Sequence, residues 1–170
     1  MKDFKYKFWL YLIVFLLLVT LDQISKIIVM NEIGLGNEGK YLPGFIRVFV
    51  VQNTGGAFSL LNNFPIFFMI VGVITSFIFS YLVFCPIVVL NDVVRAGCLC
   101  ILSGTVGNLI DRFINGAVID FLDFEFINFA VFNFADVIID LGVILILIGW
   151  YFEENFSRVC HSRESGNPGR

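Results

Sequence analysis

The stretch from Phe64 to Leu90 contains no charged residue, and it constrains the fold more than any other part of the sequence. A helix needs about 20 mostly apolar residues to cross the hydrocarbon core of a bilayer, and this stretch is long enough. Three further stretches have the same character. The sequence therefore predicts four membrane-spanning helices, at residues 8–30, 64–90, 93–113 and 132–152.

The composition agrees with a membrane protein. Hydrophobic residues make up 58% of the chain and charged residues only 15%, with 21 Phe and a mean hydropathy of +0.90. Soluble domains average about 45–50% apolar and about 25% charged residues. The basic residues are too few and too scattered for a nucleic-acid interface. The single His lies near the end of the chain, which argues against metal or triad chemistry based on His.

The distribution of Lys and Arg predicts the orientation, because cytoplasmic loops carry an excess of these residues. One side of the predicted bundle would hold Lys2, Lys5, Lys7, Arg95, Arg158, Arg163 and Arg170, and the other only Lys40 and Arg47, with Arg112 near the boundary. Both termini are therefore expected in the cytoplasm. The first span lacks a small-residue cleavage site and is interpreted as an anchor rather than a cleavable signal peptide.

The two connections that would face outward are residues 31–63 and 114–131. Within the first, residues 45–51 are rich in β-branched and aromatic side chains, which favours a strand. We expect a small β-cradle over about residues 31–63, resting on the membrane surface. The second connection is rich in Phe and is expected to form a short interfacial piece or strand. Residues 1–156 would form one membrane domain and residues 157–170 a disordered cytoplasmic tail.

Ionisable side chains inside a membrane span are costly and are by default functional candidates. The sequence places seven of them near the outer helix ends: Asp22, Lys26, Asp111, Arg112, Asp120, Asp136 and Asp140. Asp22 and Lys26 are four residues apart, so they share one helix face and are expected to form a structural ion pair.

Asn108, Asp111 and Arg112 share one face of the third predicted helix. Gly104 and Gly107 would allow another backbone to approach this face closely. Arg112 can form two parallel hydrogen bonds with a carboxylate and fix its orientation. We interpret this group as a supporting network rather than as the reacting groups.

Asn133 and Asp136 lie three residues apart at the start of the fourth helix, and Asp120 lies in the connection before it. Two carboxylates at one depth suggest a pair that shares a proton, in which one Asp acts as acid and the other as base. Asp is also favoured near helix N-termini, where it can serve as a cap. The spacing alone leaves both interpretations open.

Five motifs, taken together, resemble the lipoprotein signal peptidase (signal peptidase II) family of intramembrane aspartyl peptidases. They are Asp22-Gln-Ile-Ser-Lys26, Asn53-Thr-Gly-Gly-Ala-Phe-Ser59, Gly104-Thr-Val-Gly-Asn108-Leu-Ile-Asp111-Arg112, Val118-Ile-Asp120-Phe121 and Phe132-Asn133-Phe-Ala135-Asp136, in the order of the family. The resemblance covers about residues 8–152.

The resemblance implies a fold of four transmembrane helices with an extracytoplasmic β-cradle and an interfacial arm. It implies that Asp120 and Asp136 are the catalytic pair. It also implies that a set of surrounding residues supports the pair or contacts substrate: Asp22, Lys26, Asn53, Gly55, Asn108, Asp111, Arg112 and Asn133.

The activity implied by the resemblance is hydrolysis of a peptide bond immediately before a cysteine that carries diacylglycerol, which releases the signal peptide of a prolipoprotein. The site would lie on the extracytoplasmic side of the bacterial cell (inner) membrane, in contact with membrane lipids. Neither a cofactor nor a metal ion is implied.

Asp123 and Asp140 are not assigned by the motifs. Asp123 lies three residues after Asp120, and the sequence alone does not exclude it as the partner of Asp136. Asp140 lies one helical turn after Asp136 on the same face. We expect it to be protonated or paired with a polar neighbour such as Arg112 or Lys26.

Two other classes of membrane protein fit the sequence less well than a peptidase. A small proton-coupled transporter could use intramembrane Asp residues as a relay, but transporters commonly contain internal repeats and bind near the midplane. This sequence shows no repeat, and its acids cluster toward one interface. A purely structural subunit would have little need for several Asp residues near its helix ends.

Overall fold

The structure is a computed structural model that describes residues 2–42, 45–55 and 64–165. Its four helices are α1 (Lys2–Glu32), α2 (Pro65–Phe84), α3 (Asp92–Asn115) and α4 (Phe134–Ser165). Its three strands are β1 (Glu38–Leu42), β2 (Ile46–Asn53) and β3 (Val118–Phe124). The expected number of four spanning helices and the presence of a small sheet are thereby confirmed.

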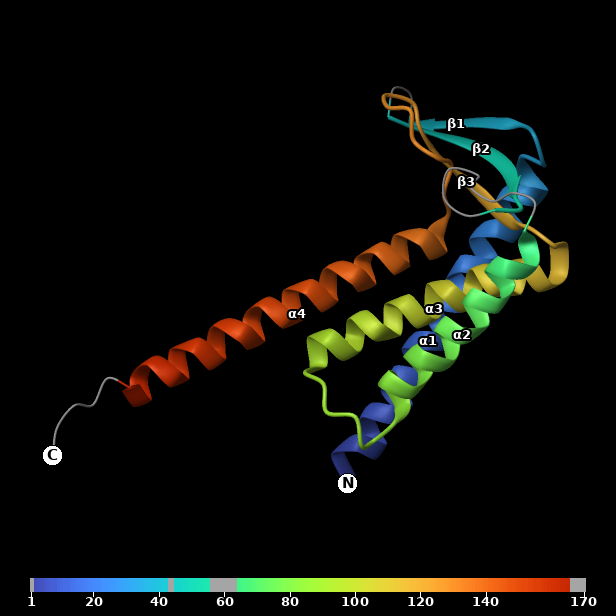
Figure 1. Cartoon of the computed structure of the whole chain (residues 1–170). Helices are drawn as coiled ribbons and strands as arrows, with labels where there is room; N and C mark the ends of the chain where they lie inside the picture. Colours follow the sequence, from blue (N-terminus) through green and yellow to red (C-terminus); the bar gives the residue numbers. More distant parts are fainter. Residues whose placement is uncertain (1, 43–44, 56–63, 166–170) are drawn as a thin grey trace, which may run out of the picture.

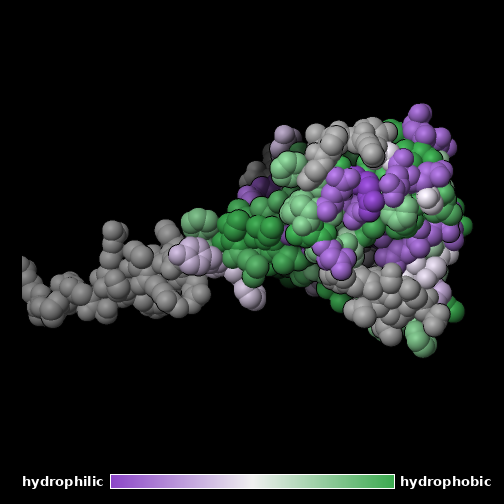
Figure 2. Space-filling view, turned by 90° about the horizontal axis from the view of Figure 1, so that it is seen from above, coloured by the Kyte–Doolittle hydropathy of each residue, from purple (hydrophilic) through white to green (hydrophobic). Residues whose placement is uncertain are grey.

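All four helices are long and apolar enough to cross a membrane, over Tyr6–Glu32, Pro65–Phe84, Asp92–Asn115 and Phe134–Glu153. The sheet lies at one end of the bundle, and the N-terminus and the α2–α3 connection lie at the other (Figure 1). Seen from the sheet end, hydrophilic residues gather over the sheet, whereas the coloured part of α4 next to the bundle is largely hydrophobic (Figure 2). The molecule thus has a polar end and an apolar body.

Helix α3 is the central helix of the bundle. In its most apolar window 61% of residues are buried, against 6–22% in the other three helices. Gly97 of α3 and Gly142 of α4 allow this packing, because a Cβ atom on Gly97 would lie 2.6 Å from the carbonyl oxygen of Gly142. Small residues at such positions let helix backbones approach closely within a membrane.

Helix α2 ends at Phe84, six residues before the predicted end of its span. Pro86 forces the residue before it out of the helical region, and Cys85 has extended backbone angles (φ −81°, ψ 124°). The buried Arg95 of α3 then donates hydrogen bonds to the carbonyl oxygens of Leu82, Val83 and Val88. These bonds satisfy backbone acceptors that the end of the helix leaves unpaired.

The sheet is antiparallel in the order β1-β2-β3. The register of β2 and β3 shifts between the pairs Val48–Leu122 and Val51–Asp120, so two residues of β2 face one residue of β3. This arrangement is a β-bulge, which bends a strand and redirects its side chains. It lies directly beside Asp120.

The free edge of β3 pairs with Phe132, just before α4. Leu122 and Phe132 exchange two backbone hydrogen bonds of 2.8 and 2.9 Å, and the Phe121 amide also donates to the Phe132 carbonyl oxygen. Residues 125–131 therefore form a loop whose two ends are held together. The strand that carries Asp120 is fixed in this way against the start of α4.

Besides the end of α2, two other expectations differ from the structure. The strand of the second connection begins at Val118 and completes a sheet that we expected from residues 31–63 alone. Helix α4 continues to Ser165, whereas the span was expected to end near residue 152 and a disordered tail to begin at residue 157. Residues 56–63 of the expected cradle and 166–170 of the tail lie outside the described residues.

Candidate active site

Asp120 enters the site from β3 and is almost fully buried, with 2% of its surface exposed. Its Oδ2 atom accepts a hydrogen bond of 2.9 Å from Asn53 at the end of β2. Its Oδ1 atom accepts one of 2.6 Å from Asn133, just before α4. Both carboxylate oxygens are thus held by amide groups from neighbouring elements.

Asp136 lies in the first turn of α4 and forms a reciprocal cap with Asn133. The Asn133 side-chain oxygen accepts from the Asp136 amide at 3.1 Å, and Asp136 Oδ2 accepts from the Asn133 amide at 3.1 Å. This is the geometry of a capping box. Asp136 Oδ1 accepts a further hydrogen bond of 2.8 Å from Asn108. Asp136 therefore has the capping role considered from the sequence, while also lining the cavity described below.

Asn133 joins the two aspartates. Its side-chain nitrogen has two hydrogens, and it donates one bond to Asp120 Oδ1 and one of 3.0 Å to Asn108 Oδ1. Asn108 in turn donates to Asp136. A closed chain of amides therefore fixes both carboxylates relative to each other.

The pKa of Asp120 is raised to about 6. Burial is the largest cause, because it penalises the charged form, and the charge of Asp136 adds to it. The hydrogen bonds from Asn53 and Asn133 and the charge of Lys26 oppose this rise. A carboxyl group with such a pKa can hold or release a proton near neutral pH.

Lys26 lies beneath the two aspartates and is 3% exposed. Its ammonium group contacts Asp22 at 2.9 Å, Asp111 at 2.8 Å and Asn108 at 3.0 Å. The predicted ion pair between Asp22 and Lys26 is therefore present, and Asp111 extends it to α3. Lys26 has no donor left over, because an ammonium group has three.

The two carboxylates around Lys26 also hold neighbouring backbone. Asp22 accepts from the Ala135 amide of α4 at 3.0 Å, and Asp111 accepts from the Ile119 amide of β3 at 3.2 Å. Gln23 was not predicted as a site residue; its side-chain nitrogen, which has two hydrogens, lies within hydrogen-bond distance of Asp22, Asp111 and the Gly107 carbonyl oxygen. The polar side chain of Gln23 beside Asp22, in an otherwise apolar helix, could have indicated from the sequence that Gln23 belongs to this network.

The expected close approach at Gly104 and Gly107 is present. A Cβ atom on Gly104 would collide with the carbonyl oxygen of Ala135, and one on Gly107 would collide with the carboxylate of Asp22. Any side chain at either position would push α3 away from α4 or α1. These glycines therefore set the distance between the helices that carry the site.

Arg112 does not form the expected paired contact with a carboxylate among the described residues. Its Nη2 atom donates to the carbonyl oxygen of Gly55 at 3.1 Å, and its guanidinium lies 5.5 Å from the centre of the Phe68 ring. Its Nε atom is buried and has no hydrogen-bond partner in the described part of the chain. Arg112 therefore has a donor to offer to another molecule.

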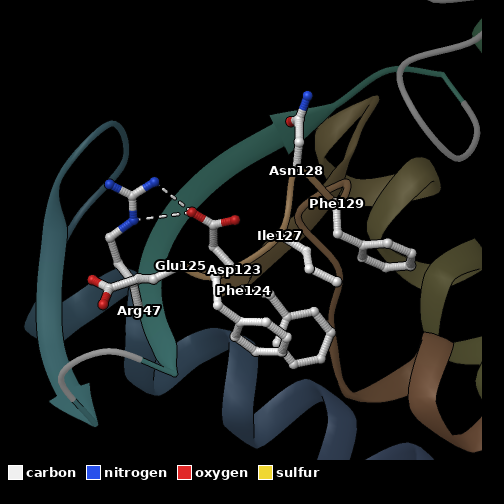
Figure 3. A pocket seen from close by; sticks show the side chains of 8 residues that line it. Arg47, Asp123, Phe124, Glu125, Ile127, Asn128 and Phe129 are labelled. Carbon is white, nitrogen blue, oxygen red and sulfur yellow. Dashed lines mark hydrogen bonds and ion pairs between the residues drawn. The ribbon is translucent and has the colours of Figure 1, made fainter.

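Asp123 lies on the other face of β3 from Asp120, because residues three apart in a strand point to opposite faces. It accepts hydrogen bonds from Arg47, whose Nε atom is 2.9 Å from Asp123 Oδ2. Figure 3 shows the two side chains directed at each other outside the sheet. Asp123 is therefore separated from Asp136 by the strand itself.

One cavity of about 650 Å³ joins the polar residues to an apolar groove. Its polar end is lined by Asn53, Asn108, Arg112, Asp120 and Asp136. The rest is lined by side chains of the 124–132 loop and by successive turns of α4, including Val137, Asp140, Leu141 and Ile144. The arrangement offers two carboxylates and a guanidinium at the end of a groove suited to apolar chains.

Comparisons with known proteins agree with this geometry. Residues 14–152 match the family model described as "Signal peptidase (SPase) II". A lipoprotein signal peptidase of Streptococcus pyogenes serotype M1 is 38% identical over 148 residues, covering 86% of this chain and 96% of that protein. The enzyme of serotype M5 (strain Manfredo) is 37% identical with the same coverage.

Two solved structures share the fold. One, described as a bacterial membrane enzyme at 2.3 Å resolution, has a TM-score of 0.75 and 25% identity, and the match covers 94% of this chain and 93% of that chain. Another bacterial membrane enzyme, at 1.9 Å resolution, has a TM-score of 0.72 and 28% identity over 81% of this chain and 90% of that chain.

Proposed function

Because this chain belongs to the signal peptidase II family, we propose that it removes signal peptides from prolipoproteins with Asp120 and Asp136 as its catalytic pair. The observation that carries the assignment is that two carboxylates from different elements, the buried Asp120 and the half-buried Asp136, line one cavity and are joined through Asn133. The expected roles of the surrounding residues follow from their contacts with this pair.

The pair acts on one water molecule. Asp120, whose pKa is raised to about 6, holds the proton, and Asp136 is the ionised partner. Asp136 takes a proton from the water molecule while the water oxygen attacks the scissile carbonyl carbon. At the same time Asp120 gives its proton to the carbonyl oxygen of the substrate. The proton held by Asp136 then passes to the departing amide nitrogen, the C–N bond breaks, and Asp120 recovers its proton from the collapsing hydroxyl.

Arg112 positions the substrate. Its buried Nε atom lacks a partner in the described part of the chain, and its side chain lines the cavity. We assign this donor to a carbonyl oxygen of the bound peptide. Such a hydrogen bond would give the Arg112 Nε atom a partner and would hold the substrate peptide in position against the two aspartates.

The remaining polar residues support the pair rather than react. Asn53, Asn108 and Asn133 hold the carboxylates. Lys26, with Asp22 and Asp111, holds the starts of β3 and α4. The backbone carbonyl oxygen of Gly55 orients Arg112.

The substrate carries a diacylglyceryl group on the cysteine after the cleaved bond. The groove beside the aspartates is lined by exposed apolar side chains of a membrane-spanning helix, so acyl chains can remain in an apolar environment while the peptide bond reaches the pair. The excess of Lys and Arg on the side of the termini supports our proposal that both termini are cytoplasmic and that the site lies at the outer surface of the bacterial inner membrane.

A cleavage assay tests the proposal. The purified protein in detergent is expected to cleave a prolipoprotein whose cysteine carries diacylglycerol, and to leave the unmodified precursor intact. Mass spectrometry of the product identifies the cleaved bond. Cleavage at another bond, or equal cleavage of both precursors, would contradict the substrate assignment.

A further inference from the structure

Asp140 is the third carboxylate among the described residues that line the cavity, and the proposed reaction does not use it. It lies on α4, one turn further from the sheet than Asp136. Its neighbours in the cavity wall, Val137, Leu141 and Ile144, are apolar and 43–52% exposed. An acidic side chain therefore interrupts a groove that is otherwise suited to apolar groups.

Asp140 has neither of the cationic partners that the sequence suggested. Lys26 has all three of its donors engaged by Asp22, Asp111 and Asn108. Arg112 donates to the backbone at Gly55 instead. Within the described part of the chain no hydrogen bond or ion pair reaches the Asp140 carboxylate. A carboxyl group at a membrane-spanning position without a partner is costly, and a ligand that brings a donor would reduce that cost.

The distance along α4 indicates which part of a substrate would reach Asp140. Four residues of helix advance about 6 Å, and an extended peptide advances about 3.3 Å per residue. With the scissile bond at Asp120 and Asp136, Asp140 would therefore face a residue about two positions away. The signal peptide is the membrane-embedded part of a prolipoprotein, so the chain that extends deeper along α4 is the part that precedes the cleaved bond.

We propose that Asp140 determines substrate specificity by accepting a hydrogen bond from the side chain of the second or third residue before the cleaved bond. This inference rests on the proposed function. It predicts a preference for hydroxyl or ammonium side chains at that position and a bias against carboxylates, which like-charge repulsion would disfavour. Asp140 acts on recognition, while the two catalytic aspartates act on the peptide bond.

The test uses a series of diacylglyceryl-modified prolipoprotein peptides with Ala, Ser, Lys or Asp at each of these two positions. For one of the positions, the wild-type protein is expected to cleave the Ser and Lys peptides with a kcat/KM about 10-fold above that of the Ala peptide, as a hydrogen bond to a charged group allows. The Asp peptide is expected to be the poorest.

Two variants of Asp140 separate recognition from catalysis. Asp140→Asn is expected to keep at least about a tenth of wild-type kcat/KM on the Ala peptide, because no proton transfer is assigned to Asp140. It is also expected to lose the preference for the Lys peptide over the Asp peptide. Asp140→Lys is expected to reverse that preference. Asp123→Asn serves as a matched control, because it removes the same charge on the outer face of β3 and should keep the wild-type order.

The outcomes separate this inference from the function on which it rests. Failure of the wild-type protein to cleave any lipidated peptide would contradict the proposed function. Normal cleavage with equal kcat/KM for the four peptides at both positions would overturn the role of Asp140 alone. A wild-type preference that survives unchanged in both Asp140 variants would overturn it as well, as would complete inactivity of a folded Asp140→Asn protein.

Discussion

Lys26 and Arg95 are buried basic residues at opposite ends of the bundle, and they are used differently. Arg95 donates to three neutral carbonyl oxygens of α2 and the α2–α3 connection, within 13 residues of itself. Lys26 contacts two carboxylates, whose other contacts reach the backbone of β3 and α4. Arg95 closes one turn of the chain, whereas Lys26 connects four elements.

The two regions also differ in what lies above the buried cation. The Arg95 region completes its own hydrogen bonds with backbone carbonyls of the adjoining turn. The Lys26 region supports a second layer, since Lys26 contacts Asn108 and Asn108 holds Asp136. The buried charges at the sheet end therefore support Asn108, Asp120 and Asp136, which line the cavity and which we call the reactive layer because of the catalytic role proposed for the two aspartates. Substitutions of the aspartates, of Lys26 and of Arg95 test whether the reactive layer, its support and the opposite end of the bundle act independently.

The largest effect is expected from the reactive layer itself. Asp120→Asn or Asp136→Asn should lower kcat/KM by roughly 10²–10⁴-fold, because Asn keeps the shape of Asp but can neither accept nor donate a proton as the carboxyl group does. The free energy of unfolding in detergent should fall far less than for loss of Lys26. Wild-type-like turnover by a folded Asp120→Asn protein would contradict the catalytic assignment.

The role of the buried cation beneath the reactive layer is tested by comparing Lys26→Met with Arg95→Met. Lys26→Met leaves two buried carboxylates without their cation and should lower the free energy of unfolding by about 3–5 kcal/mol. Arg95→Met leaves neutral carbonyl oxygens unpaired and should cost about 1–3 kcal/mol. Thermal unfolding of the two proteins in the same detergent measures the difference.

The catalytic activities of the same two variants provide a second comparison of the two ends of the bundle. The folded fraction of Arg95→Met should cleave the lipidated prolipoprotein with the wild-type kcat/KM and pH profile. Lys26→Met should lose activity even below its unfolding temperature, because the starts of β3 and α4 are no longer held. Equal loss of specific activity in both variants would mean that the two ends of the bundle are not separable.

The sequence predicted what depends on local spacing and hydropathy. The four spans follow from apolar stretches, and the ion pair of Asp22 and Lys26 follows from their spacing of four residues. The family resemblance implied that Asp120 and Asp136 form a pair, and both side chains line one cavity in the structure, while their catalytic role stays a prediction. These predictions concern residues whose neighbours along the chain already constrain their positions.

The contacts that were missed join segments far apart in the sequence. The hydrogen bond from the Ala135 amide to Asp22 and the pairing of Leu122 with Phe132 depend on how the helices and the sheet pack together. The contact of Arg112 with Gly55 likewise depends on where the β2–α2 connection passes. Asp123 could have been separated from Asp120 only once the strand was known to begin at Val118.

A pH profile tests the hydrogen bond that connects the sheet to the reactive layer. Asn53 favours the charged form of Asp120, so Asn53→Leu should raise the pKa of Asp120 above about 6. Asp120 would then keep its proton to higher pH. Because the proposed reaction needs that proton, the high-pH limb of kcat/KM should move to higher pH while the maximum rate falls. A limb that stays in place or moves to lower pH would contradict the assignment of the acid to Asp120.

The smallest effect is expected at Asp123, which differs from Asp120 by three residues and by the face of β3 on which it lies. Its carboxylate is buried against Arg47 on the face of β3 opposite Asp120, away from the cavity beside α4. Asp123→Asn should therefore change kcat/KM by less than about twofold, because no proton transfer is assigned to Asp123. The matched variant Asp120→Asn places the same chemical change on the inner face of the same strand. If Asp123→Asn is inactive and Asp120→Asn is not, the reactive layer lies on the other side of β3, and the cavity beside α4 is not the site of hydrolysis.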